Sequence, residues 1–144
     1  MISSVRKKFD KNLYDDNDTI AKEKAIQYFN RIGMRADHNS DRYGIDLIVN
    51  NKFYCEVEVK HNWKSNTFPF PDLQLSERKR KFAILDTDEF PVVFMVMNFD
   101  HTNALVVKGR DVLSSPSKEI PNKYEPKGEY FFKIPVNKTI RIKL

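Results

Sequence analysis

Three ionisable side chains alternate along the segment NNKFYCEVEVKHNW, residues 50–63. Glu56, Glu58 and Lys60 lie two residues apart, and residues at this spacing share one face of a β-strand. Two carboxylates and an ammonium on one face suit either a solvated strand with ordinary charge pairs or a divalent-metal site with an adjacent lysine. Alternating charge is common on solvated strands, so the pattern alone favours ordinary pairing. For Glu56, which lies ~7 Å along the strand from Glu58, pairing with a lysine is the favoured role.

A further carboxylate, Asp46, lies within the apolar segment YGIDLIV, residues 43–49. A carboxylate in apolar surroundings is costly unless it meets a cation. Asn50 and Asn51 tolerate positive φ and predict a hairpin turn, which brings Asp46 near residues 54–56. Carboxylates gathered there repel one another unless a divalent ion lies among them. Mg²⁺ uses one or two carboxylates and keeps waters that a phosphate substrate can replace.

The register of this hairpin decides whether such a site can form. A two-residue turn would pair Asp46 with Cys55 and place it on the face opposite Glu58. The metal-site hypothesis therefore requires a β-bulge, an odd-numbered loop, or a bend at residues 44–45. A regular hairpin with Asp46 facing away would exclude the site.

The rest of the chain predicts one α/β domain over residues 1–144, with a central mixed β-sheet flanked by helices and an extra β tail. A helix is expected over 17–33, capped by Asn17 or Asp18 and ended by Gly33. Strands are expected over 42–50, 52–63, 91–99 and 104–108, with a short basic helix over 77–86 capped by Ser76 and closing strands after residue 129. Loops are expected at 1–16, as a loose lead-in, at 64–75, and at 114–129.

Composition narrows the partners. The net charge of +5 favours an anionic partner, nucleic acid first. A single cysteine excludes an internal disulfide, and the three histidines lack metal-ligand spacing. There is no apolar run of the ~20 residues that a membrane helix needs, and the first residues lack the apolar stretch of a secretory signal. We expect an intracellular location without membrane association.

Asp46, in a Gly-x-Asp-Leu strand, is followed after eleven residues by Glu58-Val59-Lys60. This pattern resembles the PD-(D/E)xK nuclease superfamily, to which restriction endonucleases and archaeal-type Holliday-junction resolvases belong. The likeness covers roughly residues 17–108 by element order and implies a restriction-endonuclease-like core. Ile45 stands where the family motif opens with Pro.

The resemblance implies a role for each motif residue. Asp46 and Glu58 would bind Mg²⁺, for which Mn²⁺ can substitute, with the Val59 carbonyl as a third ligand. Lys60 would orient the attacking water, help to deprotonate it, and stabilise charge on the phosphate. Glu23, in the leading helix, would correspond to the further acid of many members, although its helical phase favours solvent.

Nucleic-acid contacts are expected from two segments. In SERKRKFAIL, residues 76–85, Arg78 and Lys79 angle toward the core side, whereas Lys81 looks outward. A solvated charge run is the alternative for all three. Trp63, in an aromatic loop, would wedge against bases, the alternative being packing over the sheet edge.

Together these features predict a Mg²⁺-dependent endonuclease that hydrolyses DNA phosphodiester bonds and selects branched or repair intermediates, as a Holliday-junction resolvase does. RNA stays open as a substrate, and a homodimer is one expected assembly. Two alternatives also stay open: a catalytically inactive nucleic-acid-binding module on the same fold, and a basic α/β domain with a charged strand face.

Overall fold

The computed structural model describes residues 11–41, 44–122 and 125–144. The prediction of a loose lead-in lies outside the described residues for 1–10 and is wrong for 11–16. These six residues belong to helix α1 (Lys11–Arg31), which begins earlier than expected. Asn17 and Asp18 therefore lie inside the helix and do not cap it. Asp18 instead forms an ion pair one turn along with Lys22, at 3.0 Å.

Helix α1 ends as the sequence predicts. Gly33 has a φ of 88°, a conformation that costs glycine little because it has no Cβ. The Gly33 N–H donates to the Asn30 carbonyl at 3.1 Å, and the Met34 N–H donates to the Phe29 carbonyl at 2.8 Å. These two bonds close the last turn as a glycine-terminated cap.

Among the described residues, six strands form one mixed sheet in the order β1-β2-β3-β5-β6-β9. Strands β3 and β5 are parallel, and the other neighbours are antiparallel. The bounds are β1 (Ala36–His38), β2 (Leu47–Val49), β3 (Phe53–Val59), β5 (Val92–Met97), β6 (Asn103–Lys108) and β9 (Ile140–Lys143). The predicted mixed sheet with flanking helices is confirmed. β1 was not predicted, and β2 is much shorter than the predicted strand over 42–50.

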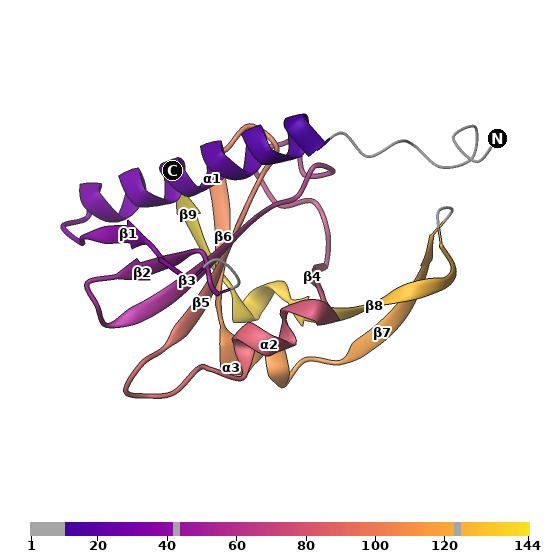
Figure 1. Cartoon of the computed structure of the whole chain (residues 1–144). Helices are drawn as coiled ribbons and strands as arrows, with labels where there is room; N and C mark the ends of the chain where they lie inside the picture. The colour runs from indigo at the N-terminus through magenta and orange to yellow at the C-terminus, as the bar shows by residue number, and fades with distance from the viewer. Residues whose placement is uncertain (1–10, 42–43, 123–124) are drawn as a thin grey trace.

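A second layer covers one face of this sheet. Strands β4 (Asp72–Ser76), β8 (Glu125–Pro135) and β7 (Ser117–Asn122) form a smaller antiparallel sheet, so the loops predicted at 64–75 and 114–129 are partly wrong. β7 pairs with β8 alone, and this hairpin extends beyond the main sheet (Figure 1). The sequence of residues 117–128 is polar and contains Pro, which explains why it resembled a loop. The closing strands expected after residue 129 are confirmed by the rest of β8, which buries Phe132 and Ile134, and by β9.

Short helical elements complete the second layer. Ser76 caps η2 (Glu77–Lys79), as predicted, by accepting a hydrogen bond from the Arg78 N–H. The chain continues into α2 (Arg80–Ala83), and α3 (Gly109–Leu113), which was not predicted, follows β6. A last turn, η3 (Val136–Lys138), leads into β9.

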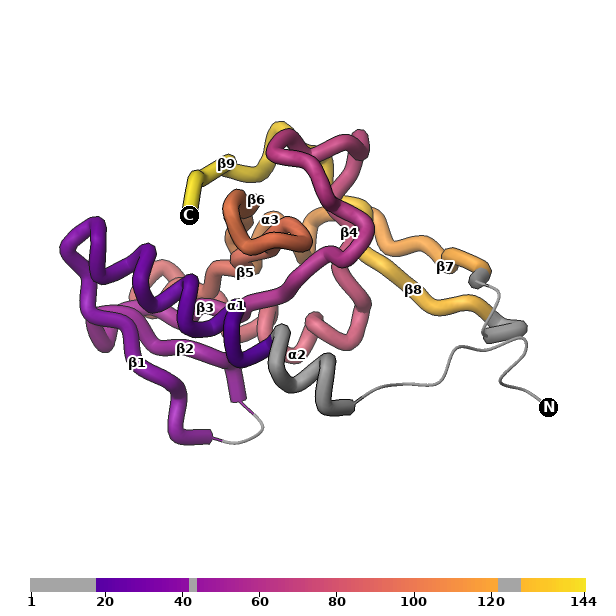
Figure 2. Tube along the Cα trace, turned by 90° about the horizontal axis from the view of Figure 1, so that it is seen from above, coloured from indigo at the N-terminus to yellow at the C-terminus, as the bar shows by residue number. Residues whose placement is uncertain are grey.

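The core lies on both faces of the main sheet, with α1 against one face and the second layer against the other (Figures 1 and 2). The cluster under α1 includes Ala21, Ala25, Phe29, Leu47, Cys55 and Met95. The cluster under the second layer includes Trp63, Leu73, Phe82, Phe94, Val112 and Phe132. β5 contributes to both clusters, which confirms the prediction that it is covered on both faces. No helix in the described part of the chain is long and apolar enough to cross a membrane.

Candidate active site

The hairpin that carries the motif has an odd-numbered loop. Asn50 and Asn51 adopt φ values of 53° and 52°, and the Lys52 N–H donates to the Val49 carbonyl at 2.9 Å. Val49 nevertheless lies opposite Phe53, so that three residues separate the paired strands. The pairing expected from a two-residue turn is wrong, and the irregularity that the metal-site hypothesis requires is present.

Asp46 lies just beyond the paired part of β2, where the chain departs from β3. Its N–H donates to Glu56 Oε1 at 3.1 Å, and its Oδ2 accepts the Val57 N–H at 2.9 Å. Its Oδ1 lies 3.3 Å from Lys22 Nζ on α1. These contacts hold the Asp46 carboxylate at the start of β2, between Lys22 on α1 and the residues of β3 around Glu56.

Glu56 is buried and paired. It is 5% exposed, and its Oε2 lies 2.6 Å from Lys79 Nζ. The predicted pairing of Glu56 with a lysine is therefore confirmed. Burial, and then the nearby charge of Asp46, raise the pKa of Glu56 to about 7, against the opposing effect of Lys79. Glu56 thus joins the Asp46 backbone to a cation from the second layer.

Lys79 faces the carboxylates, as its predicted position on the core side of the helix implies. Burial lowers its pKa, but the charges of Glu56, Glu58 and Asp46 outweigh this and hold the pKa above its ordinary value. Lys79 therefore remains an ammonium whose field acts on all three carboxylates. The pKa of Lys22 is raised in the same way, because the lowering effect of burial is outweighed by hydrogen bonds and charges from Asp18 and Asp46.

A pocket of about 380 Å³ collects these groups. The acids that line it are Asp18, Asp46, Glu56 and Glu58, and the cations are Arg78, Lys79 and Lys81. Val57 and Val59 also line it. The charged groups therefore come from α1, the residue preceding β2, β3, and the η2–α2 turn.

The acid that α1 contributes to this pocket is Asp18, a residue that sequence reasoning missed. Glu23 is exposed and bonds to His38 at 3.2 Å, and it does not line the pocket. Asp18 was interpreted as a helix cap because the start of the helix was placed too late. Its spacing of four residues from Lys22 indicates an ion pair on one helix face, but it does not indicate that this face meets the pocket.

Lys60 joins this pocket to a second one. Its Nζ lies 2.9 Å from Glu58 Oε2, but its side chain lines a neighbouring pocket and not the one that contains Asp46. β3 ends at Val59, and His61, two residues further on, also lines the pocket of Asp46.

Of the residues predicted to contact nucleic acid, Trp63 is buried, whereas Arg78 and Lys81 are accessible. Trp63 is fully buried in the core cluster of the second layer, so the expected role against bases is wrong and its alternative, packing, applies. Arg78 is exposed at the pocket and pairs with Glu129 at 2.9 Å, and Lys81 extends over the Phe82 ring. Both cations remain accessible from solvent, as a contact to a phosphate backbone requires.

The donor set fits a hard divalent cation. Mg²⁺ needs only one or two carboxylates besides water. Asp46, Glu58 and Val59, whose carbonyl is the expected third ligand, all line the same pocket. Lysine ammonium groups already lie within 3.3 Å of Asp46 and 2.9 Å of Glu58, so cations occupy the neighbourhood of both carboxylates. No group of three or more His, Cys, Asp or Glu side chains in the described part of the chain has the spacing of a complete metal site.

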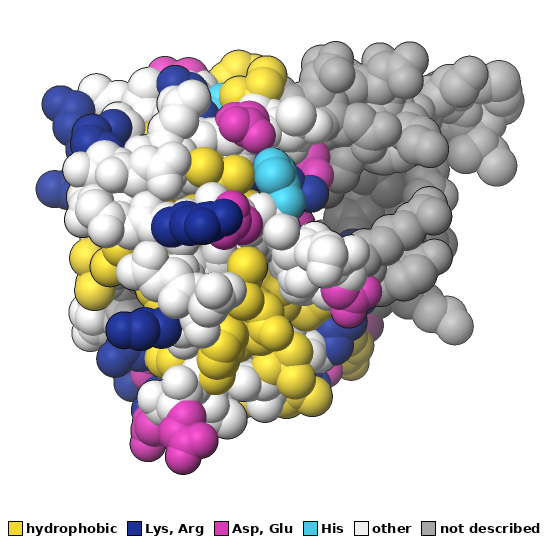
Figure 3. Space-filling model, turned by 60° about the vertical axis from the view of Figure 1, so that its left-hand side comes forward, with side chains coloured by type: hydrophobic (Ala, Val, Ile, Leu, Met, Phe, Trp, Pro, Cys, Tyr) yellow, Lys and Arg dark blue, Asp and Glu magenta, His cyan; other side chains and the backbone are white. Residues whose placement is uncertain are grey.

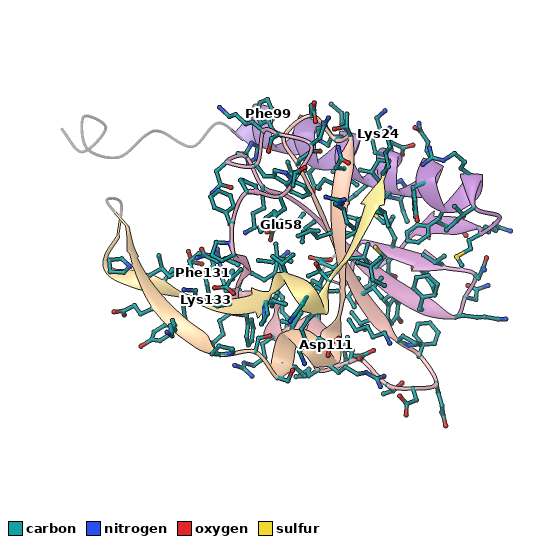
Figure 4. All side chains as sticks on the ribbon, turned by 180° about the vertical axis from the view of Figure 1, so that it is seen from behind. Lys24, Glu58, Phe99, Asp111, Phe131 and Lys133 are labelled. Atoms are coloured by element: carbon teal, nitrogen blue, oxygen red, sulfur yellow. The ribbon has the colours of Figure 1, made fainter. Side chains whose placement is uncertain are left out.

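In the view of Figure 4, Glu58 lies between α1 and strand β8, inside the outline of the molecule. On the face drawn in Figure 3, Lys and Arg side chains lie apart from one another among uncharged and acidic groups and do not gather into one patch. Neither the protein-family models nor the curated protein sequences contain a match to this chain.

Proposed function

We propose that the chain is a Mg²⁺-dependent nuclease that hydrolyses phosphodiester bonds of DNA, on a restriction-endonuclease-like core. The observation that carries this proposal is the pocket in which carboxylates from two adjacent strands meet cations from the η2–α2 turn. The order of elements supports it as well: a leading helix, the strand of Asp46, the strand of Glu58, a basic turn and then a strand parallel to β3. Carboxylates suit a metal, and the cations suit a phosphate backbone.

Asp46 and Glu58, with the Val59 carbonyl, would hold the metal. When bound, Mg²⁺ lowers the pKa of a coordinated water and neutralises charge on the phosphate. Glu56 keeps Asp46 in place through its backbone N–H, and Lys22 would have to release Asp46 Oδ1. Lys60, whose ammonium lies beside Glu58, would orient a water near that carboxylate and contact a phosphate oxygen.

One observation favours a second candidate function, a nucleic-acid-binding module without catalysis. Asp46, Glu56 and Glu58 each already contact a lysine, at 3.3, 2.6 and 2.9 Å. A protein that uses these carboxylates only to fix lysines would keep the same structure without a metal. The two functions differ in whether the protein cleaves nucleic acid, and only the nuclease needs a divalent ion.

Metal binding can be measured directly as a shift in melting temperature. We expect Mg²⁺ or Mn²⁺ to raise the melting temperature, because a ligand that binds only the folded state stabilises it by ~2.7 kcal/mol at a hundred times its Kd. Glu58→Ala should abolish the shift. The matched control Glu89→Ala removes an exposed glutamate outside the pocket and should retain it. A full shift in Glu58→Ala would overturn the ligand assignment.

Cleavage is the decisive test. Supercoiled, linear, single-stranded and branched DNA would be incubated with Mg²⁺ and either the wild-type protein or Lys60→Ala. We expect the wild type to cleave at least one substrate, and Lys60→Ala to do so at least about a hundredfold more slowly, since one charge-stabilising group contributes that much. Lys52→Ala, at the hairpin turn, is the matched control. Failure to cleave any substrate, despite a metal-dependent shift in melting temperature, would favour the binding module.

A further inference from the structure

A second pocket, of about 200 Å³, lies on the other side of Lys60 from the candidate active site. Its walls come from the loop after β3 and from strands β4 and β8 of the smaller sheet. The side chains that give it its chemistry are Lys60, Asn62, Phe68, Phe70, Gln74 and Lys133, together with one carboxylate, Asp72. Lys60 and the aromatic loop that carries Phe68 and Phe70 were singled out from the sequence, and the proposed function does not use Phe68 or Phe70.

One wall of this second pocket is aromatic. Phe70 is 39% exposed, and its ring lies 5.4 Å from that of Phe68 at an interplanar angle of 75°. Phe68 in turn packs edge-on against the buried Trp63 at 5.1 Å. This chain of ring contacts fixes an accessible phenyl group to the core. Accessible aromatic rings on a fixed support are the platforms on which unpaired bases stack.

The remaining walls are polar and lie on regular structure. Gln74 on β4 lies directly opposite Lys133 on β8, on the sheet face away from the core residues Leu73 and Leu75. The amides of Gln74 and Asn62 can both donate and accept hydrogen bonds, as the edges of bases require. Lys133 and Lys60 add two ammonium groups, each near one carboxylate: Asp72 at 3.9 Å and Glu58 at 2.9 Å.

The position of Lys60 links the two pockets. Its ammonium contacts Glu58, which lines the first pocket, while its side chain lines the second. A phosphate beside Glu58 would therefore have the nucleotide next to it directed toward Phe70 and Gln74. In a duplex, bases are stacked and paired and cannot enter such a pocket, whereas an unpaired base can.

We propose that this second pocket binds the base of an unpaired nucleotide flanking the phosphate at the candidate active site. The base stacks on Phe70, the amides of Gln74 and Asn62 contact its edge, and Lys60 and Lys133 contact the adjoining phosphates. The link to a scissile phosphate rests on the proposed function. Base binding itself does not, because it needs neither metal nor cleavage. The proposal makes nucleic acids with single-stranded flanks, such as overhangs and branch points, the preferred ligands.

Binding is measured by fluorescence anisotropy in EDTA with three labelled DNAs that share one duplex sequence. The first duplex is blunt, the second has a single-stranded extension, and the third has an extension of abasic residues that keeps the phosphates but lacks the bases. We expect the wild type to bind the extension with bases about tenfold more tightly than the abasic one, which corresponds to ~1.4 kcal/mol. Equal affinity for these two DNAs overturns the proposal.

Variants then locate the preference. Phe70→Ala should reduce it to about twofold or less, and Phe70→Trp should retain it because the indole also stacks. Phe99→Ala is the matched control, since Phe99 is 48% exposed, lines neither pocket, and lies at the α1 end of the molecule, away from Lys133 (Figure 4). A preference that survives in Phe70→Ala, or that is lost equally in Phe99→Ala, overturns the assignment of the pocket.

These results separate the two proposals. If the protein prefers the extension with bases through Phe70 but cleaves no DNA with Mg²⁺, the base pocket stands and the nuclease function fails. If it cleaves DNA but binds the abasic extension as tightly as the one with bases, the nuclease function stands and the base pocket fails.

Discussion

At the scale of single residues, Glu56 has a larger structural role than its sequence pattern indicated. Taken alone, its alternation with Glu58 suggested an ordinary exposed charge. In the fold it is almost fully buried, accepts the Asp46 N–H, and contacts Lys79. Loss of this side chain would release both the backbone of Asp46 and the ammonium of Lys79. Glu56 therefore supports the site whether or not it ever contacts a ligand.

The raised pKa of Glu56 predicts a specific pH dependence of stability. From an ordinary value of 4.5 it rises to about 7, because burial and Asp46 oppose its charge. Between these two values the folded state binds more protons than the unfolded state, so the contribution of Glu56 to the free energy of unfolding decreases as pH rises through this window. The decrease amounts to at most about 3 kcal/mol.

Urea unfolding of the wild type and Glu56→Gln, at a series of pH values from 4 to 8, checks this dependence. Glu56→Gln should lack the decrease, so the difference between the two free energies should change across the window. Glu89→Gln, at an exposed position, should follow the wild type. Parallel profiles for wild type and Glu56→Gln would show that Glu56 titrates normally.

At the scale of elements, Asp86 connects the end of α2, the start of β5 and α3. Its side chain is 1% exposed and accepts hydrogen bonds from the Val92 N–H, the Arg110 N–H and Arg110 Nε, at 2.8, 3.0 and 2.9 Å. Burial alone would raise the pKa of Asp86, but the bonds from Val92 and Arg110 outweigh it and hold the pKa below its ordinary value of 3.8. β5 is the parallel partner of β3, which carries Glu56 and Glu58. By binding the start of β5, Asp86 therefore helps to position the strands that support the site.

Asp86→Asn should therefore lower the free energy of unfolding at pH 7 by about 2–3 kcal/mol, since hydrogen bonds to a charged group contribute ~1.5–3 kcal/mol. The stabilisation is present above pH 3.8 and is lost as pH falls through the lower pKa of the folded state. Urea unfolding at pH 7 and at pH 3 measures both effects. Asp88→Asn is the control, because Asp88 contacts the same arginine but is 88% exposed. An equal loss in both variants would contradict the role of burial.

The elements also show how far the sequence could predict the fold. The strands richest in apolar residues, β3, β5 and β6, were predicted because apolar side chains at strand spacing indicate which residues are buried. β1 has three residues and only Ala36 buried, so it has almost no apolar pattern, and β7 and the first part of β8 form a hairpin outside the main sheet whose sequence is polar. The first turns of α1 were missed because their residues are polar and charged, with no clear apolar stripe.

The site was predictable in part for similar reasons. Asp46 and Glu58 were singled out from strand alternation and the chemistry of carboxylates, whereas the odd-numbered loop was only a condition that the metal-site hypothesis required. Asp18 and Lys22 could not be placed there, because their approach depends on the way α1 crosses the sheet. Trp63 was misassigned because a loop position says nothing about which layer covers it, and here β4 and β8 do.

At the scale of the whole molecule, a net charge of +5 predicts salt-sensitive binding to nucleic acid. Exposed cations at the pocket, Arg78 and Lys81, with Lys79 behind them, suggest about three phosphate contacts. The logarithm of the binding constant should then fall with the logarithm of salt concentration with a slope of about −3. Arg78→Gln should reduce the magnitude of this slope by about 1.

Binding titrations of a duplex DNA over a range of salt concentrations give these slopes. Lys52→Gln removes one positive charge at the hairpin turn, from a residue that lines neither of the two pockets, and should leave the slope unchanged. An equal change in both variants would mean that overall charge governs binding and not the cations at the pocket.

The three-residue loop between Val49 and Phe53 has a consequence for how this protein can vary. Surface loops generally accept insertions and deletions readily. Here the number of residues, rather than their identity, determines on which side of the sheet Asp46 emerges. Removing Lys52 would leave every proposed ligand in the chain and yet separate Asp46 from Glu58. For the proposed site, the length of this loop therefore matters more than its side chains. Variants should tolerate changes of side chain in the loop, but changes of length only in steps of two, which keep Asp46 and Glu58 on the same face.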